Sequence, residues 1–182
     1  MFSTIYGPIT ALQHNKYLNT QLLICDIDGV FSDGRIYLGN NGEELKAFHT
    51  RDGFGIKAII NAGIQVAVIT GRKSTIVEKR MTSLGVQHIF QGQENKLEAY
   101  AKLKQLTQLN DAQIAYIGDD VPDQTVMTEV GLAIATQDAH PIIQQIADHK
   151  TSIRGGFGAV REVCDILLET RGILAQAQGM SV

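Results

Sequence analysis

LLICDIDGVFSDG occupies residues 22–34, and it begins as a buried strand and ends in three carboxylates. Its first six residues are apolar except for Asp26, which is typical of a strand that a parallel sheet buries on both faces. Asp28 and Asp33 follow within the same stretch. Because a buried carboxylate without a partner is costly, acids at such positions are paired, bound to a metal, or already in the loop beyond the strand. The stretch therefore predicts a parallel sheet with a polar site at the end of one strand.

The same apolar pattern recurs along the chain and alternates with helical periodicity. Further strands are expected at residues 64–70, 86–90, 114–117 and 132–135, and helices at residues 52–62, 74–84, 94–106, 124–130, 141–147 and 159–170. Strands that alternate with helices over short connections predict an α/β fold: a three-layer, doubly wound, Rossmann-like parallel sheet with helices on both faces. An Asn-Gly pair between two β-prone segments predicts a projecting β-hairpin over residues 35–48.

Length and composition indicate one globular domain over residues 1–182. A chain of 182 residues that is 44% hydrophobic and 19% charged can bury one core and leaves no room for a cap domain. Residues 1–20 are interpreted as an N-terminal extension and residues 171–182 as a C-terminal tail.

Charge and hydropathy disfavour several classes of partner. The 16 basic residues are scattered among 19 acidic ones, and the net charge is −3, so neither nucleic acid nor a membrane surface is expected as a partner. No stretch approaches the roughly 20 apolar residues of a membrane span, and the start of the chain lacks a leader pattern. We therefore expect a cytoplasmic protein in which Cys25 and Cys164 are buried free thiols.

Polar residues follow three of the expected strands at the point where each strand ends. They are Asp26 and Asp28 after the first strand, Thr70, Gly71 and Arg72 after the second, and Asp119, Asp120 and Asp123 in the segment GDDVPD. Because the carboxyl ends of parallel strands share one edge of a sheet, these side chains are expected to converge there. So many acids without matching bases favour a hard divalent cation such as Mg²⁺, which prefers oxygen ligands.

This residue set suits phosphoryl transfer. An Asp that is a metal ligand also lies near the phosphorus of a metal-bound phosphate and can attack it. Thr70 stands at the right strand end, and Lys96 begins a helix from which it can reach the same edge to neutralise phosphate oxygens. Asp28, with acidic neighbours that would favour its protonated form, can supply a proton to the leaving oxygen.

Four motifs in order resemble those of the haloacid dehalogenase-type phosphatase superfamily: DIDGV, VITGR, the lysine of ENKLEAY, and GDDVPD. The resemblance implies that Asp26 is the nucleophile and Asp28 the acid/base, whose backbone carbonyl also binds the metal. It implies further roles for residues outside the first motif: Thr70 and Lys96 as contacts of phosphate oxygens, Asp119 as the second carboxylate on Mg²⁺, and Asp120 and Asp123 as supporting acids.

Two longer segments, DGVFSDGRIYLGNNGEELKAFHTRDGFGIK and RGGFGAVREVCDILL, resemble the small capless branch that includes the 3-deoxy-D-manno-octulosonate 8-phosphate phosphatases of bacterial lipopolysaccharide synthesis. This resemblance implies a Mg²⁺-dependent phosphatase of a phosphorylated acidic sugar that works as a homotetramer assembled around the hairpins. Gly71 and Arg72 would contact the substrate, since an arginine suits a sugar carboxylate. Arg80 and Arg51 are further candidates.

Alternative interpretations stay open. An isolated Asp-x-Asp commonly only caps a helix or solvates a turn. A phospho-accepting receiver-like module uses similar residues, but there the accepting Asp lies on a middle strand after an acidic pair on the first. A phosphatase of a related nonulosonate 9-phosphate is a third candidate. The glycines of RGGFG could cradle phosphate or form a hinge before the last helix.

Overall fold

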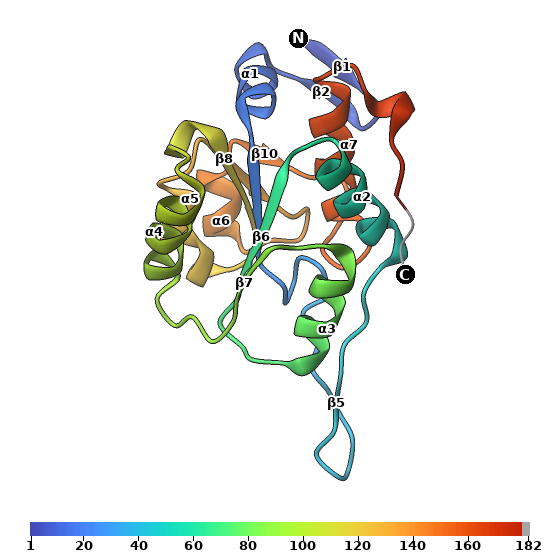
Figure 1. Ribbon diagram of the computed structural model, residues 1–182, viewed down its shortest axis with the longest axis vertical. Helices are drawn as coiled ribbons and strands as arrows, with labels where there is room; N and C mark the ends of the chain where they lie inside the picture. The colour runs from blue at the N-terminus through green and yellow to red at the C-terminus, as the bar shows by residue number, and fades with distance from the viewer. Residues whose placement is uncertain (180–182) are drawn as a thin grey trace.

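The computed structural model describes residues 1–179, and within this range six parallel strands form a central sheet in the order β10-β9-β8-β3-β6-β7 (Figure 1). The strands are β3 (Leu22–Cys25), β6 (Gln65–Ile69), β7 (His88–Phe90), β8 (Ile114–Gly118), β9 (Leu132–Ala135) and β10 (His149–Lys150). From β3 the chain adds β6 and β7 on one side, and it then returns to add β8, β9 and β10 on the other side. The sheet is therefore doubly wound. The expected α/β class is therefore confirmed, while the edge strand β10 is an addition.

Helices cover both faces of the sheet. One face packs against α2 (Thr50–Asn61), α3 (Thr75–Leu84) and α7 (Ala159–Glu169), and the other packs against α4 (Lys96–Thr107), α5 (Gln124–Met127) and α6 (Pro141–Ile146). Successive strand residues point to opposite faces, so Leu23 and Cys25 join the first core cluster and Leu22 and Ile24 the second. A strand buried on both faces has to be apolar at every position, which explains the run that opens LLICDIDGVFSDG.

The N-terminal segment folds onto the body of the protein. β1 (Phe2–Thr4) and β2 (Gly7–Ile9) form an antiparallel pair, and α1 (Ala11–Asn19) follows. Thr10 and Gln13 cap that helix reciprocally, and Tyr17 is completely buried. The extension expected over residues 1–20 thus contains a helix that the sequence analysis did not predict.

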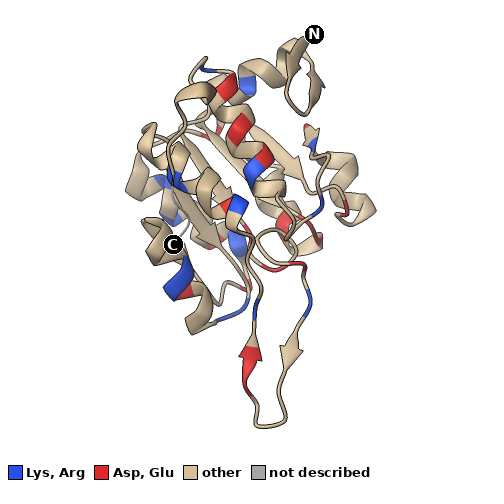
Figure 2. Cartoon of the chain, turned by 90° about the vertical axis from the view of Figure 1, so that its right-hand side faces the viewer, with Lys and Arg blue, Asp and Glu red and all other residues tan. Residues whose placement is uncertain are grey.

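The hairpin between the first strand and α2 is confirmed. β4 (Tyr37–Leu38) and β5 (Glu44–Leu45) pair antiparallel, and the hairpin projects from the body (Figures 1 and 2). Gly42, in the turn, has a φ of 84°, which suits glycine. Exposed apolar side chains line the hairpin: Ile36, Leu38 and Leu45.

Short 3₁₀ turns complete the chain: η1 (Asp111–Gln113), η2 (Val121–Asp123) and η3 (Leu174–Gln176). In the expected tail, Ile173 and Leu174 pack against the core, and residues 180–182 of that tail lie outside the described residues. Both cysteines are buried and free, as expected. Among residues 1–179, no helix is both long and apolar enough to cross a membrane.

Candidate active site

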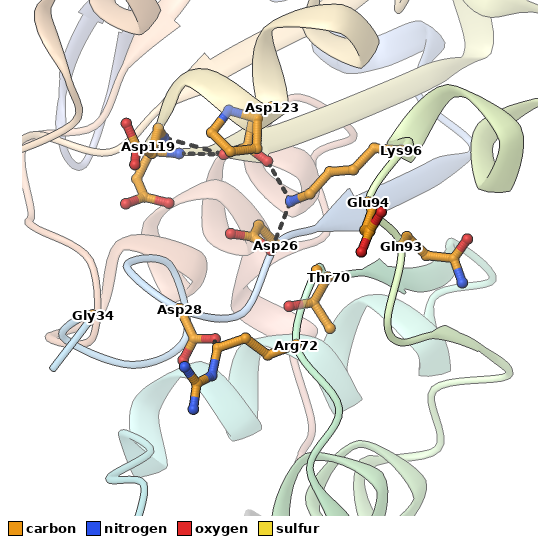
Figure 3. Close-up of a pocket in the computed structure, with 13 residues that line it drawn as sticks. Asp26, Asp28, Gly34, Thr70, Arg72, Gln93, Glu94, Lys96, Asp119 and Asp123 are labelled. Carbon is orange, nitrogen blue, oxygen red and sulfur yellow. Dashed lines mark hydrogen bonds and ion pairs between the residues drawn. The ribbon is translucent and has the colours of Figure 1, made fainter. Parts of the chain in front are cut away.

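A pocket of about 380 Å³ opens at the carboxyl ends of β3, β6 and β8 (Figure 3). Its lining contains nine of the residues singled out from the sequence: Asp26, Asp28, Thr70, Gly71, Arg72, Lys96, Asp119, Asp120 and Asp123. The remaining lining residues were not anticipated: Gly34, Gln93, Glu94 and Pro122. The convergence follows from the parallel sheet, because each of these loops leaves a strand at the same edge.

Lys96 lies between two carboxylates at the bottom of this pocket. Its Nζ is 2.9 Å from Asp26 Oδ1 and 2.7 Å from Asp123 Oδ1. Figure 3 marks both contacts with dashed lines. The Lys96 side chain is only 4% exposed, and Nζ also donates to the hydroxyl of Tyr116 at 3.2 Å. Asn95 caps α4 by accepting from the backbone N–H of Leu97, which fixes Lys96 at the first position of the helix. The buried ammonium group of Lys96 is stabilised by the carboxylates of Asp26 and Asp123 and lies in contact with Asp26.

Asp123 is fully occupied by hydrogen bonds. Its Oδ1 accepts from Lys96 and, at 2.6 Å, from the Tyr116 hydroxyl, whereas its Oδ2 accepts from the backbone N–H groups of Asp119 and Asp120 at 2.9 and 3.2 Å. Asp123 therefore orders the loop after β8 and leaves the second oxygen of Asp26 and the carboxylate of Asp119 as the available acids. Asp120 accepts from the N–H of Val121 and begins η2.

The acids at the site repel one another. Burial raises the pKa of the Asp26 carboxyl to about 7, the charge of Asp123 adds to this rise, and the charge of Lys96 opposes it. Burial, with the charges of Asp26 and Asp123, raises the pKa of Asp119 to about 8. Burial by itself lowers the pKa of Lys96, but the charges of Asp26 and Asp123 outweigh it, so that this pKa lies above its ordinary value.

The donor set fits a hard divalent cation. Carboxylate oxygens of Asp26, Asp119 and Asp123 lie within 4.8 Å of one another. A side chain at Gly29 would bring its Cβ to 2.0 Å from Asp119 Oδ2, so glycine there leaves room for this carboxylate. Because Asp123 is already occupied, Asp26 and Asp119 are the side chains that would hold Mg²⁺. The side chain of Asp28 is not part of this cluster, and a role for its backbone carbonyl remains a prediction.

Asp28 has cationic neighbours, where the sequence analysis had expected acidic ones. Its Oδ1 forms an ion pair with Lys46, and its Oδ2 is 3.9 Å from Arg72 Nε. Lys46 directly follows the hairpin strand β5 and was not anticipated, because its approach to Asp28 depends on how the hairpin folds back. The acids surround Asp26 and Asp119 instead.

Two candidate arginines lie elsewhere. Arg51 is exposed in the first turn of α2, and Arg80 interacts electrostatically with the buried Asp52. Neither residue lines the pocket of its own chain, so their proposed contacts with substrate remain predictions.

The glycines of RGGFG serve close packing. A Cβ at Gly155 would lie 1.7 Å from the carbonyl oxygen of Gly29, and the N–H of Gly156 donates to the carbonyl of Val30 at 2.9 Å. This loop therefore packs closely against the backbone of residues 29–33, directly after the Asp26–Asp28 segment, and neither Gly155 nor Gly156 lines the pocket.

Comparisons with known proteins agree with this geometry. A family model described as haloacid dehalogenase-like hydrolase matches residues 85–155. The 3-deoxy-D-manno-octulosonate 8-phosphate phosphatase KdsC of Escherichia coli (strain B / BL21-DE3) is 52% identical over 180 residues, covering 99% of this chain and 96% of that protein.

Solved structures show the same likeness. The crystal structure of 3-deoxy-D-manno-octulosonate 8-phosphate phosphatase from Yersinia pestis has a TM-score of 0.97 at 50% identity and covers 100% of this chain and 98% of that one. The phosphatase of that name from Moraxella catarrhalis, in complex with magnesium, phosphate and a KDO molecule, has a TM-score of 0.87 at 38% identity, covering 90% and 94%.

The fold, the pocket and these matches define a class, the haloacid dehalogenase-like hydrolases. Within that class, the chain belongs to the family of the 3-deoxy-D-manno-octulosonate 8-phosphate phosphatases.

The raised pKa values predict how pH affects stability. Asp26 and Asp119 have folded-state pKa values of about 7 and about 8, above their ordinary value of 3.8. The metal-free folded state therefore binds more protons than the unfolded chain in this window, and stability is lost as pH rises from about 4 to about 8. Mg²⁺ binds the ionised acids, so it should raise the melting temperature more at pH 8 than at pH 6.

Asp119→Asn separates this effect from general salt effects. The variant removes one repelling charge, so its metal-free melting temperature should exceed that of the wild type at pH 8, by about 2–4 °C for each kcal/mol gained. It should also lose most of the Mg²⁺-induced shift. Thermal melting with EDTA or Mg²⁺ measures the metal-free melting temperature and its rise on addition of Mg²⁺. An equal rise in the two proteins would show that Asp119 does not bind the metal.

Proposed function

We propose that this chain is a Mg²⁺-dependent phosphatase that hydrolyses 3-deoxy-D-manno-octulosonate 8-phosphate to the free sugar acid and phosphate, a step that supplies lipopolysaccharide synthesis. The observation that carries the proposal is the position of Asp26: it directly follows the central strand β3, contacts Lys96 at 2.9 Å and shares a pocket with Thr70 and Asp119. The full-length similarity to KdsC supports the substrate.

The mechanism uses the chain's own side chains in two halves. Asp26 attacks phosphorus and forms an aspartyl phosphate while the bond from phosphorus to the sugar oxygen breaks, and Asp28 gives that oxygen a proton. Asp28 then takes a proton from water, whose oxygen attacks the phosphorus, so that phosphate is released and Asp26 is restored. Asp26 and Asp119 would hold Mg²⁺, which would there neutralise part of the negative charge of the phosphate.

Lys96 and Thr70 complete the phosphate site in this proposal. Thr70 is 2% exposed, and two hydrogen bonds fix its backbone. Its N–H donates to the carbonyl of Phe90, and its carbonyl accepts from the N–H of Gln93. Lys96 offers a fixed positive charge beside Asp26, where negative charge on the equatorial oxygens has to be balanced. Both groups are ordered before substrate arrives, so little reorganisation is needed during the reaction.

A panel of sugar phosphates tests the proposed function. We expect Mg²⁺-dependent, multiple-turnover release of phosphate from the eight-carbon acid sugar phosphate, and EDTA should abolish it. Faster hydrolysis of a nonulosonate 9-phosphate would replace the substrate with that alternative. A single equivalent of phosphate retained on the protein, with no turnover, would instead support a receiver-like module.

Arg72→Ala tests how the sugar is recognised. Arg72 lines the pocket mouth with 45% of its side chain exposed, and a guanidinium can bind a carboxylate through two N–H donors. The variant should raise KM for the acid sugar phosphate about tenfold or more and leave KM for an aryl phosphate nearly unchanged. Equal effects on both substrates would exclude a contact between Arg72 and the sugar acid.

We further propose that four copies of this chain form a homotetramer and that the protein works in the cytoplasm. The exposed apolar residues Ile36, Leu38 and Leu45 lie on a hairpin that projects from the body, as expected of a surface that another copy covers. Light scattering measures the assembly in solution, and fractionation of the source cells tests the compartment.

A further inference from the structure

Four alternating charges form a closed ring where the hairpin meets the active site. Asp28 uses Oδ1 for Lys46 and Oδ2 for Arg72, at 3.9 Å from Arg72 Nε. Glu44 likewise divides its oxygens: Oε1 is 3.3 Å from Lys46 Nζ, and Oε2 is 2.6 Å from Arg72 Nη2. Each acid therefore contacts both bases, and each base contacts both acids.

The burial of Lys46 distinguishes this ring from ordinary surface ion pairs. Exposed ion pairs contribute little to stability, because water screens them, and they need not fix a geometry. The Lys46 side chain is only 1% exposed, while those of Asp28 and Glu44 are 23% and 24% exposed. An ammonium group removed from water needs counter-charges. The carboxylates of Asp28 and Glu44 therefore fix the position of Lys46, and Lys46 in turn fixes the positions of both carboxylates.

The ring joins two residues of the pocket to two residues of the hairpin. Asp28 and Arg72 lie beside each other in the pocket (Figure 3), whereas Glu44 and Lys46 do not line it. In Figure 2 one strand of the hairpin carries a red, acidic segment, and blue, basic segments lie between the hairpin strands and the body. The hairpin thus contacts the site through the charges of Glu44 and Lys46, which lie outside the pocket lining.

We propose that Glu44 and Lys46 are positioning residues of this active site, Lys46 for the acid/base Asp28 and Glu44 for the guanidinium of Arg72. The inference rests on the proposed function, in which Asp28 transfers a proton and Arg72 receives the sugar carboxylate. The ring engages Nε and Nη2 of Arg72, and its Nη1 carries two further N–H donors for a substrate.

The two hairpin residues should affect different kinetic constants. Misplacing Asp28 slows proton transfer with every substrate, so loss of the Lys46 charge should lower kcat. Misplacing Arg72 weakens binding of a substrate that carries a carboxylate, so loss of the Glu44 charge should raise KM for that substrate alone. A merely structural role would not separate the two constants in this way.

Matched substitutions test the division. Glu44→Gln is compared with Glu43→Gln, the same change one residue earlier, where Glu43 accepts from the N–H of Asn41 in the hairpin turn. Lys46→Met is compared with Lys102→Met on the exposed surface of α4. We expect Glu44→Gln to raise KM for the acid sugar phosphate about tenfold with kcat within about twofold, and Lys46→Met to lower kcat about tenfold or more on both acid sugar and aryl phosphates.

Several results would overturn the proposal. Equal KM values for the Glu44 and Glu43 variants would show that Glu44 does not position Arg72. A wild-type kcat in Lys46→Met would show that Lys46 does not position Asp28. Amide hydrogen exchange over residues 37–45 gives a readout without turnover: it should be at least about tenfold faster in Lys46→Met than in Lys102→Met. If the wild type turned over an aryl phosphate but no acid sugar phosphate, the proposed function would be overturned. The kcat and exchange measurements on Lys46→Met would still test whether Lys46 positions Asp28.

Discussion

Asp26→Asn is expected to abolish turnover while the protein stays folded. The amide keeps the shape of the side chain but cannot form the acyl phosphate, so kcat should fall by about 10⁴-fold or more with every phosphate ester. Stability should not suffer, because Asp26 is buried among acids and the pKa of its carboxyl is already raised to about 7. The amide removes that repulsion and keeps an oxygen for Lys96. Phosphate release measured under single-turnover and steady-state conditions tests this result.

Asp28→Asn is the matched comparison for Asp26→Asn. It makes the same chemical change two residues later on a carboxylate that contacts Lys46 and Arg72 in place of Lys96. In the mechanism proposed above, Asp28→Asn still forms the aspartyl phosphate from a substrate with a good leaving group, and Asp26→Asn does not. Trapped phosphoprotein in the first variant and none in the second would agree with the assigned roles. Normal phosphate release by Asp26→Asn would refute the nucleophile.

The sheet and the acids of the site were predictable because they depend on local patterns. Asp26 and Asp119 each follow a strand buried on both faces, and a parallel sheet brings such positions to one edge. Lys96 was expected at the start of a helix near this edge, and the order of the family motifs distinguished it from the other lysines of that helix. Its burial against Tyr116 depends on how α4 docks onto the sheet, which the spacing of its own residues does not reveal.

The elements that the sequence analysis missed lack a strong apolar signal. Within α1 only Tyr17 is buried, so the helix has little periodicity, although Thr10 and Gln13 carry the capping pattern that could have identified it. β10 has two residues and pairs only at the sheet edge. The contacts of Lys46 and Glu44 with the site are tertiary, since they depend on the angle at which the hairpin leaves the body.

Lys96→Met is expected to impair both stability and turnover. Lys96 is the shared cation of Asp26 and Asp123, and its removal leaves a buried cluster of acids without compensation. Breaking a buried pair by removing one partner typically costs about 3–5 kcal/mol. Since protonation of Asp26 can relieve part of this cost, the loss of stability should be greater at pH 8 than at pH 6. Turnover should fall by about 10²–10³-fold or more, because a fixed charge beside the phosphate is lost.

A second substitution separates the two effects. In Lys96→Met combined with Asp123→Asn, one of the two buried negative charges that Lys96 compensated is removed. The amide oxygen can still accept from the N–H groups of Asp119 and Asp120, while the amide NH2 donates to the oxygen of the Tyr116 hydroxyl. Much of the lost melting temperature should return, while turnover should remain low because no cation is restored at the phosphate. Recovery of both would mean that Lys96 only holds the loop after β8. Lys102→Met, on the exposed surface of the same helix, should change neither quantity.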